Sequence, residues 1–200
     1  AYRKEKGDHR WTCPYIPVDP HDIGRTYDAD VIRINSQSGK GGIGFVLEQN
    51  YGYNLPAKMR EALGYKVKSV SDHNHKELSA GEVLHIFEDA FLNKSKPLSV
   101  VEAHFAQVNG ITATVTLDLN GQRKVVTSVG AVANAIQSAT GMEFHLETYS
   151  EHSLDEGSTS RAASYVGLAW GDGVVTWGAG TDTDIIVAGI HALVSAINNK

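Results

Sequence analysis

Residues 111–139 read ITATVTLDLNGQRKVVTSVGAVANAIQSA, and this stretch decides the fold class of the chain. From Ile111 to Leu119, apolar residues alternate with threonine and aspartate, which predicts a strand with one buried face. Asn120-Gly121 is the strongest short signal for a β-hairpin, and a return strand, Lys124 to Val129, follows it. A helical pattern over 131–139 completes the unit.

The same order of elements returns near the C-terminus. Ser164–Trp170 predicts a strand, Asp172-Gly173 a hairpin turn, Val174–Ala179 a return strand and Asp184–Asn198 a helix. A leading strand is also predicted before each copy, over 100–108 and 142–151. An internal repeat in the sequence indicates symmetry in the fold. The sequence therefore predicts an α+β fold containing a pseudo-twofold repeat of two βββα units, with two sheets packed on paired helices around one core.

The chain before the repeat is predicted to be helical. Gly41–Gln49 is a short apolar helix candidate, and Pro56 suits the first turn of a helix that runs to Val70. Ser79 and Glu82 have the spacing of a capping box, and their helix should end before Pro97. We therefore expect the chain to have three parts: an extended proline-containing linker over 1–30, a helical linker subdomain over 31–96 and a C-terminal domain over 97–200.

Composition narrows the classes of protein that this chain can represent. It is 42% hydrophobic and 20% charged over 200 residues, which is enough to bury a core. A net charge of -5 argues against nucleic acid as a partner, and no apolar run reaches the roughly 20 residues of a membrane helix. The one cysteine, Cys13, can form no internal disulfide, so we expect a cytoplasmic location. The charged start without methionine suggests that more protein precedes it.

The two copies of the repeat differ after their return strands. When Gly130 is aligned with Gly180, the second copy has four residues, Thr181 to Asp184, that the first copy lacks. Either the first copy has lost this turn, or a mobile segment of about four or five residues is missing between Gly130 and Ala131. We expect the second explanation.

Two other stretches resemble ligand sites but lack essential features. SQSGKGG at 36–42 lacks the first glycine and the final serine or threonine of a phosphate loop, so we interpret it as a flexible hinge. His73 and His75 would form half of a zinc site on a strand, but the polar stretch 71–77 is predicted to be a loop without a third ligand. We therefore expect neither a metal site nor a self-contained catalytic site.

The turns at Gly130 and Gly180 suggest a binding function. Each is predicted to lead from a strand into a helix, whose free N–H groups favour an anion. Asp182 and Asp184 would cap the second helix or receive an ammonium group. Two hypotheses remain open here: the turns hold a zwitterion between them, or they serve only as helix caps.

Several stretches together carry a family resemblance. They are WTCPYIPVDP at 11–20, DIGR at 22–25, RINSQSGKGG at 33–42, YSEH at 149–152 followed by Gly157, and WGAG at 177–180 with the turn at 182–184. In this order they resemble the C-terminal linker and leucine-sensing regulatory domain of 2-isopropylmalate synthases, over essentially the whole chain. The catalytic barrel of that family would lie upstream.

The resemblance implies a regulatory role with leucine as feedback inhibitor in leucine biosynthesis. It further implies a homodimer that contacts its own N-terminal barrel, where a divalent metal would lie; this region alone would need no cofactor and be inactive. Tyr15 would lie near catalysis, towards the partner's barrel. The implied leucine-binding residues are Gly130, the remnant of a Gly-Asn-Gly-Pro turn in the family, with Leu146, Tyr149, Ser153, Ser160, Thr181, Asp182, Thr183 and Asp184.

Two alternatives remain at this point. The same architecture occurs in citramalate synthases, whose regulatory domain would sense isoleucine. The chain would otherwise be a purely structural dimerisation module, which the apolar helical stretch from Ala188 to Ile197 would support.

Overall fold

The structure, a computed structural model, describes Asp22, Gly24 and residues 40–107, 110–155 and 160–200. The chain divides into two units, 1–32 and 33–200, and every helix and strand named below belongs to the second. The extended linker expected over 1–30, including Tyr15, lies outside the described residues except for Asp22 and Gly24.

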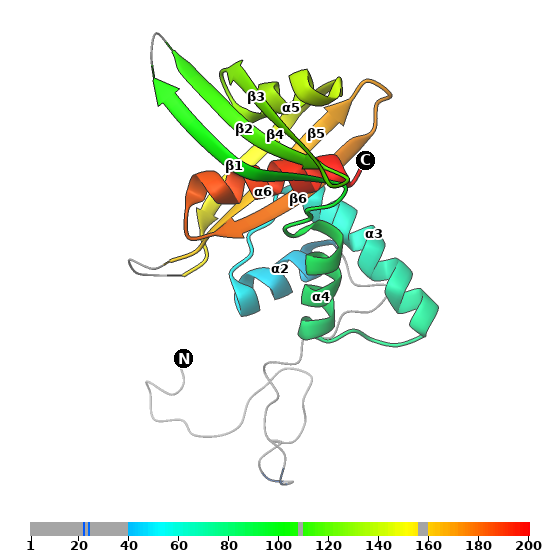
Figure 1. Cartoon of the computed structure of the whole chain (residues 1–200). Helices are drawn as coiled ribbons and strands as arrows, with labels where there is room; N and C mark the ends of the chain where they lie inside the picture. Colours follow the sequence, from blue (N-terminus) through cyan, green and yellow to red (C-terminus); the bar gives the residue numbers. More distant parts are fainter. Residues whose placement is uncertain (1–21, 23, 25–39, 108–109, 156–159) are drawn as a thin grey trace. The chain divides into compact units, whose positions relative to one another are not determined.

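Three helices precede the repeat, as expected. They are α2 (Lys40–Tyr51), α3 (Ala57–Asn74) and α4 (Ala80–Phe91), shown grouped together in Figure 1. The predicted capping box is present at the start of α4. Ser79 Oγ accepts a hydrogen bond from the Glu82 N–H at 3.3 Å, and Glu82 Oε2 accepts one from the Ser79 N–H at 2.9 Å.

Helix α3 is longer than the sequence suggested. The polar stretch beginning at Ser71 was expected to be a loop, but the helix continues through Asn74, so that prediction was wrong at its start. Ser71 is buried, and its hydroxyl is satisfied there by donating to the Lys76 carbonyl at 2.8 Å. His75 then ends the helix with a left-handed φ of 49°.

The repeat has the predicted order of elements. Its first copy contains β1 (Leu98–Gln107), β2 (Ile111–Leu119), β3 (Gln122–Val129) and α5 (Val132–Thr140). Its second copy contains β4 (Phe144–Ser153), β5 (Ala162–Trp170), β6 (Val175–Asp182) and α6 (Ile185–Asn198). The strands form two antiparallel three-stranded sheets, ordered β1-β2-β3 and β4-β5-β6 (Figure 1). The predicted α+β fold with two βββα units is confirmed.

The two sheets are buried differently, and the sequences of their central strands explain why. In β2 the apolar residues Ala113, Val115 and Leu117 are buried while the threonines between them are partly exposed. Most of β5 is buried on both faces, because Tyr165 packs in one core cluster and Val166 in another. An alternating strand is typical of a one-sided sheet, and a continuous apolar strand of a covered one.

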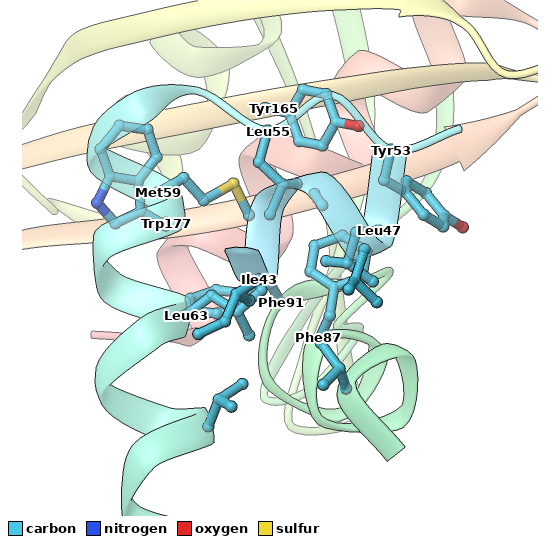
Figure 2. Packing of buried hydrophobic residues seen from close by; sticks show 14 of the residues in the cluster. Ile43, Leu47, Tyr53, Leu55, Met59, Leu63, Phe87, Phe91, Tyr165 and Trp177 are labelled. Carbon is cyan, nitrogen blue, oxygen red and sulfur yellow. The ribbon is translucent and has the colours of Figure 1, made fainter. Parts of the chain in front are cut away.

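The two core clusters lie on opposite faces of the β4-β5-β6 sheet. The first combines α2, α3 and α4 with Tyr165 and Trp177 from the sheet, as Figure 2 shows. The second joins both copies of the repeat through α5, α6 and both sheets. The core predicted between the two copies is therefore present, and the helical subdomain contributes a further one.

Helix α6 lies directly on the backbone of β6. A Cβ atom added to Gly180 would lie 2.1 Å from the Ala188 carbonyl oxygen, and one added to Gly178 would lie 2.2 Å from the Ala192 carbonyl oxygen. These glycines allow a close approach between backbones and do not mark the end of the strand. The prediction that the return strand ends at Gly180 was therefore wrong, because β6 continues to Asp182.

The pairing of the strands also corrects the alignment of the two turns. Leu98 pairs with Leu119 as Phe144 pairs with Trp170, which makes Ile111 equivalent to Ala162. The Gly130 N–H donates to the Ile111 carbonyl at 2.7 Å, and Asp182 pairs with Ala162. Gly130 therefore corresponds to Asp182 and not to Gly180.

With this register, the two turns differ by one residue. Only Ala131 lies between Gly130 and α5, whereas Thr183 and Asp184 lie between Asp182 and α6. Gly130 has a φ of 99° and turns the chain directly into Ala131. The register reduces the difference between the two turns from four residues to one, with the first copy having the shorter turn, and the expectation of a missing segment stays a prediction.

Candidate functional site

A cavity of about 620 Å³ opens between α5, α6 and β4. Its lining is mostly apolar, as is usual for a site that binds a small organic molecule. The lining residues are Phe105, Ala131, Val132, Ala133, Asn134, Gln137, Phe144, His145, Leu146, Tyr149, Val166, Leu168, Ile186, Gly189, Ile190 and Leu193. Both copies of the repeat contribute, so the cavity depends on their packing.

Two β4 residues present large apolar surfaces to this cavity. Leu146 is 60% exposed and Tyr149 is 49% exposed, although both are large hydrophobic side chains. Burying either residue against a ligand would remove that surface from water, which is favourable.

Tyr149 is held in place at its hydroxyl end. The hydroxyl donates a hydrogen bond to the Glu151 carboxylate, and it would lie 3.2 Å from a Cβ atom added to Gly189 of α6. Burial, followed by the hydrogen bond to Glu151, raises the pKa of Tyr149 above its ordinary value. The tyrosine is therefore neutral at physiological pH, with its proton on the side facing Glu151.

The start of α5 supplies polar groups to the cavity. Ala131 occupies the N-cap position and has no side chain that can accept from the first-turn N–H groups. The equivalent position before α6 is Asp184, whose Oδ1 accepts from the Ile186 N–H at 2.8 Å. Of the two related helix starts, the one at the cavity lacks a side-chain cap and is thus better suited to receive an anion.

The structure brings some of the predicted effector residues together at this cavity. Leu146 and Tyr149 line it, and Gly130 directly precedes the lining residue Ala131. Ser153 and Ser160 lie elsewhere: their hydroxyls contact each other, and Ser153 Oγ donates to the Asp155 carbonyl at 2.6 Å. The hydroxyls of these two serines therefore form hydrogen bonds at the turn after β4 and do not face the cavity.

The predicted residues of the second turn do not line this cavity. Thr181 donates its N–H to Asn93 Oδ1 at 3.1 Å, and Asp182 Oδ1 accepts from the Asp184 N–H at 3.0 Å. Thr183 donates its hydroxyl to Asp182 at 3.4 Å. Asp184 lines another cavity, of about 300 Å³, which shares Phe105, Ile186 and Ile190 with the first. The turn thus lies beside the candidate site, and its side-chain hydrogen bonds mainly cap the start of α6.

The sequence reasoning missed most of the lining contributed by helices. Phe105 and the residues of α5 and α6 at the cavity were not predicted. The sequence did contain one signal of the α6 lining, the pair Ile185-Ile186 at the start of the helix. In the structure these two side chains are 44% and 54% exposed. Two exposed isoleucines before the buried stripe of a helix indicate a surface that contacts something else.

The described residues give no sign of a metal site. Within 40–107, 110–155 and 160–200, no three histidine, cysteine or acidic side chains lie close enough to hold a metal ion. His73 lies in the last turn of α3, and His75 follows it as the C-cap residue. In the same part of the chain, no helix is both long and apolar enough to span a membrane.

Comparisons with known proteins identify the region. Residues 77–200 match the LeuA allosteric (dimerisation) domain, and residues 1–48 match the alpha-isopropylmalate synthase post-catalytic domain-like family. The 2-isopropylmalate synthase of Desulfitobacterium hafniense is 48% identical over 98% of the chain, and that of Helicobacter hepaticus is 43% identical over 99%.

The matched regions form only part of these relatives. The chain spans 36% of the first relative's length and 38% of the second's. The first family match covers most of the chain, including α4, both βββα units and the cavity between them. The chain therefore belongs to the LeuA allosteric (dimerisation) domain family and corresponds to the C-terminal region of 2-isopropylmalate synthases.

Proposed function

We propose that this chain binds leucine in the 620 Å³ cavity and acts as the feedback-inhibited regulatory region of a 2-isopropylmalate synthase. The cavity is the observation that carries the proposal, because it combines an apolar lining with an uncapped helix start. A free aliphatic amino acid needs both features: an apolar surface for its side chain and donors for its carboxylate.

The proposed orientation of leucine follows from the chemistry of the lining. The isobutyl group would lie against Leu146 and the other apolar residues of the cavity. The carboxylate would accept from the free N–H groups after Ala131, where the helix dipole favours negative charge. The ammonium group would lie near the pair formed by Tyr149 and Glu151, whose carboxylate accepts the hydrogen bond of the tyrosine hydroxyl.

Regulation would follow from a difference in affinity between two arrangements of the protein. If leucine binds the inhibited arrangement more tightly, it shifts the population towards that arrangement. Reaction chemistry would belong to the part of the synthase that lies outside this chain, with a divalent metal there and Tyr15 nearby. This chain alone should therefore consume no acetyl-CoA.

Homodimer formation is the second part of the proposal. The family match supports it, and so does the number of large apolar side chains that remain exposed on the repeat. On β2 and β3, Ile111, Val125 and Val129 are 55%, 66% and 74% exposed. A second copy that covered such residues would remove them from water.

Calorimetric titration of the 200-residue chain with leucine tests the ligand, with isoleucine titrated in parallel. We expect leucine to bind more tightly than isoleucine, because the two isomers differ in the shape of the side chain that the apolar lining must fit. Tighter binding of isoleucine would favour the citramalate synthase alternative. A dimer in sedimentation that binds neither amino acid at millimolar concentration would favour a purely structural module.

A further inference from the structure

Strand β4 contacts the candidate site and the helical subdomain at the same time. Leu146 and Tyr149 line the cavity, whereas Glu147, between them in sequence, forms an ion pair with Lys58 of α3. At the far end of the strand, His152 contacts Asn54 in the connection between α2 and α3. Residues of one strand therefore touch the proposed effector on one side and the linker helices on the other.

The hydrogen bonds of His152 define its tautomer. Nδ1 lies 3.0 Å from the Ser153 carbonyl oxygen, which can only accept, so Nδ1 carries the proton. Nε2 is then an acceptor, and its single lone pair is shared by the Asn54 N–H at 3.3 Å and the Tyr165 hydroxyl at 3.0 Å. One ring nitrogen thus joins the α2–α3 connection to the central strand of the second sheet.

Tyr165 makes this contact costly to break. Its side chain is fully buried in the core cluster of α2, α3 and α4 (Figure 2), and burial raises the pKa of its hydroxyl well above the ordinary value. A buried hydroxyl that loses its partner is left unsatisfied, which destabilises the fold. The rings of His152 and Tyr165 are also stacked, with centroids 5.6 Å apart and planes at 25°.

We propose that His152 couples ligand occupancy of the cavity to the α2–α3 connection. This inference rests on the proposed leucine binding and adds the route by which that binding reaches the linker helices. A ligand that draws Leu146 and Tyr149 inward displaces β4, and His152 carries the displacement to the Asn54 amide. His152 does not line the cavity, so it is a positioning residue.

Amide hydrogen exchange on the full 200-residue chain tests this route, with and without saturating leucine. In the unmodified chain, leucine should slow exchange in α5 and at the Asn54 amide by about fivefold or more, the lower end of usual coupling strengths. His152→Ala should keep the protection in α5 and lose it at Asn54. His152→Gln retains a hydrogen-bond acceptor and should restore the leucine-dependent protection at Asn54. The matched control is His73→Gln on the exposed side of α3, which should behave as the unmodified chain does.

Each outcome bears on a different claim. Leucine-dependent protection at Asn54 that survives in His152→Ala, with binding intact, overturns the coupling role alone. Failure of the unmodified chain to bind leucine overturns the proposed function together with this inference. If His152→Ala does not fold, His152→Thr suits a strand, lacks an acceptor at the Nε2 position and makes the same comparison.

Discussion

Gly180→Ala should be among the most damaging small substitutions in this chain. The added methyl group would lie 2.1 Å from the Ala188 carbonyl oxygen and 2.5 Å from the Ala192 nitrogen. Both are backbone atoms of α6, so neither can rotate away. Ordinary contact begins at 3.4 Å, which means that α6 must move from β6 by about 1.3 Å.

That displacement sets the expected magnitude. Overpacking a core typically costs 1–3 kcal/mol, and here the whole of α6 must shift, so we expect a loss of about 3 kcal/mol in the free energy of unfolding. For a chain of this size, 1 kcal/mol corresponds to about 2–4 °C in melting temperature, so the midpoint should fall by about 6–12 °C.

Urea unfolding followed by circular dichroism measures the free energy, and scanning calorimetry measures the melting temperature. Gly171→Ala is the matched control, because an added Cβ there meets no atom within 4 Å; it should stay within about 0.5 kcal/mol of the unmodified chain. If Gly180→Ala proves equally mild, with an unchanged m-value, the close packing of α6 on β6 is not as described.

Three further predictions concern the cavity and the linker helices. Leu146→Ala should weaken leucine binding about tenfold in calorimetry. It should change the free energy of unfolding by less than about 0.5 kcal/mol, because Leu146 is mostly exposed. An unchanged affinity for leucine would show that Leu146 is not part of the site. Ser79→Ala should lower unfolding free energy by about 1 kcal/mol through loss of the capping box, whereas an unchanged urea midpoint would contradict this. Hydrogen bonds to Lys76 and Ser79 lower the pKa of Glu82 from 4.5 to about 2. A carboxyl group whose pKa is lower in the folded than in the unfolded chain stabilises the fold at pH values above its unfolded pKa. The melting temperature of the unmodified chain should therefore exceed that of Glu82→Gln by its full amount above pH 4.5, and the difference should vanish towards pH 2. A difference that stays constant with pH would contradict this prediction.

The architecture of the repeat could be predicted because its signals are local. Alternation in Ile111–Leu119, the Asn120-Gly121 turn and the capping box at Ser79 each depend on residues close in sequence. Asn120 and Gly121 both have positive φ values, 53° and 85°, as that hairpin signal requires.

The register of the two turns could not be predicted in the same way. Gly130 turns the chain, whereas Gly180 accommodates a helix packed against a strand, and the two roles look identical in the sequence. Distinguishing them requires knowing that α6 lies on β6, which is a long-range contact. The same limit applies to the cavity, where lining residues from β1, α5 and α6 meet only after both copies have packed.

The burial of β5 on both faces means that the linker helices and the repeat melt together. Tyr165 belongs to the core of the helices, and Val166, its neighbour in sequence, belongs to the core of the repeat. Removing α2–α4 would leave Tyr165 and Trp177 facing water on a sheet that has lost one covering layer. Residues 40–200 should therefore unfold in one cooperative transition, and a module cut at the start of β1 would tend to aggregate.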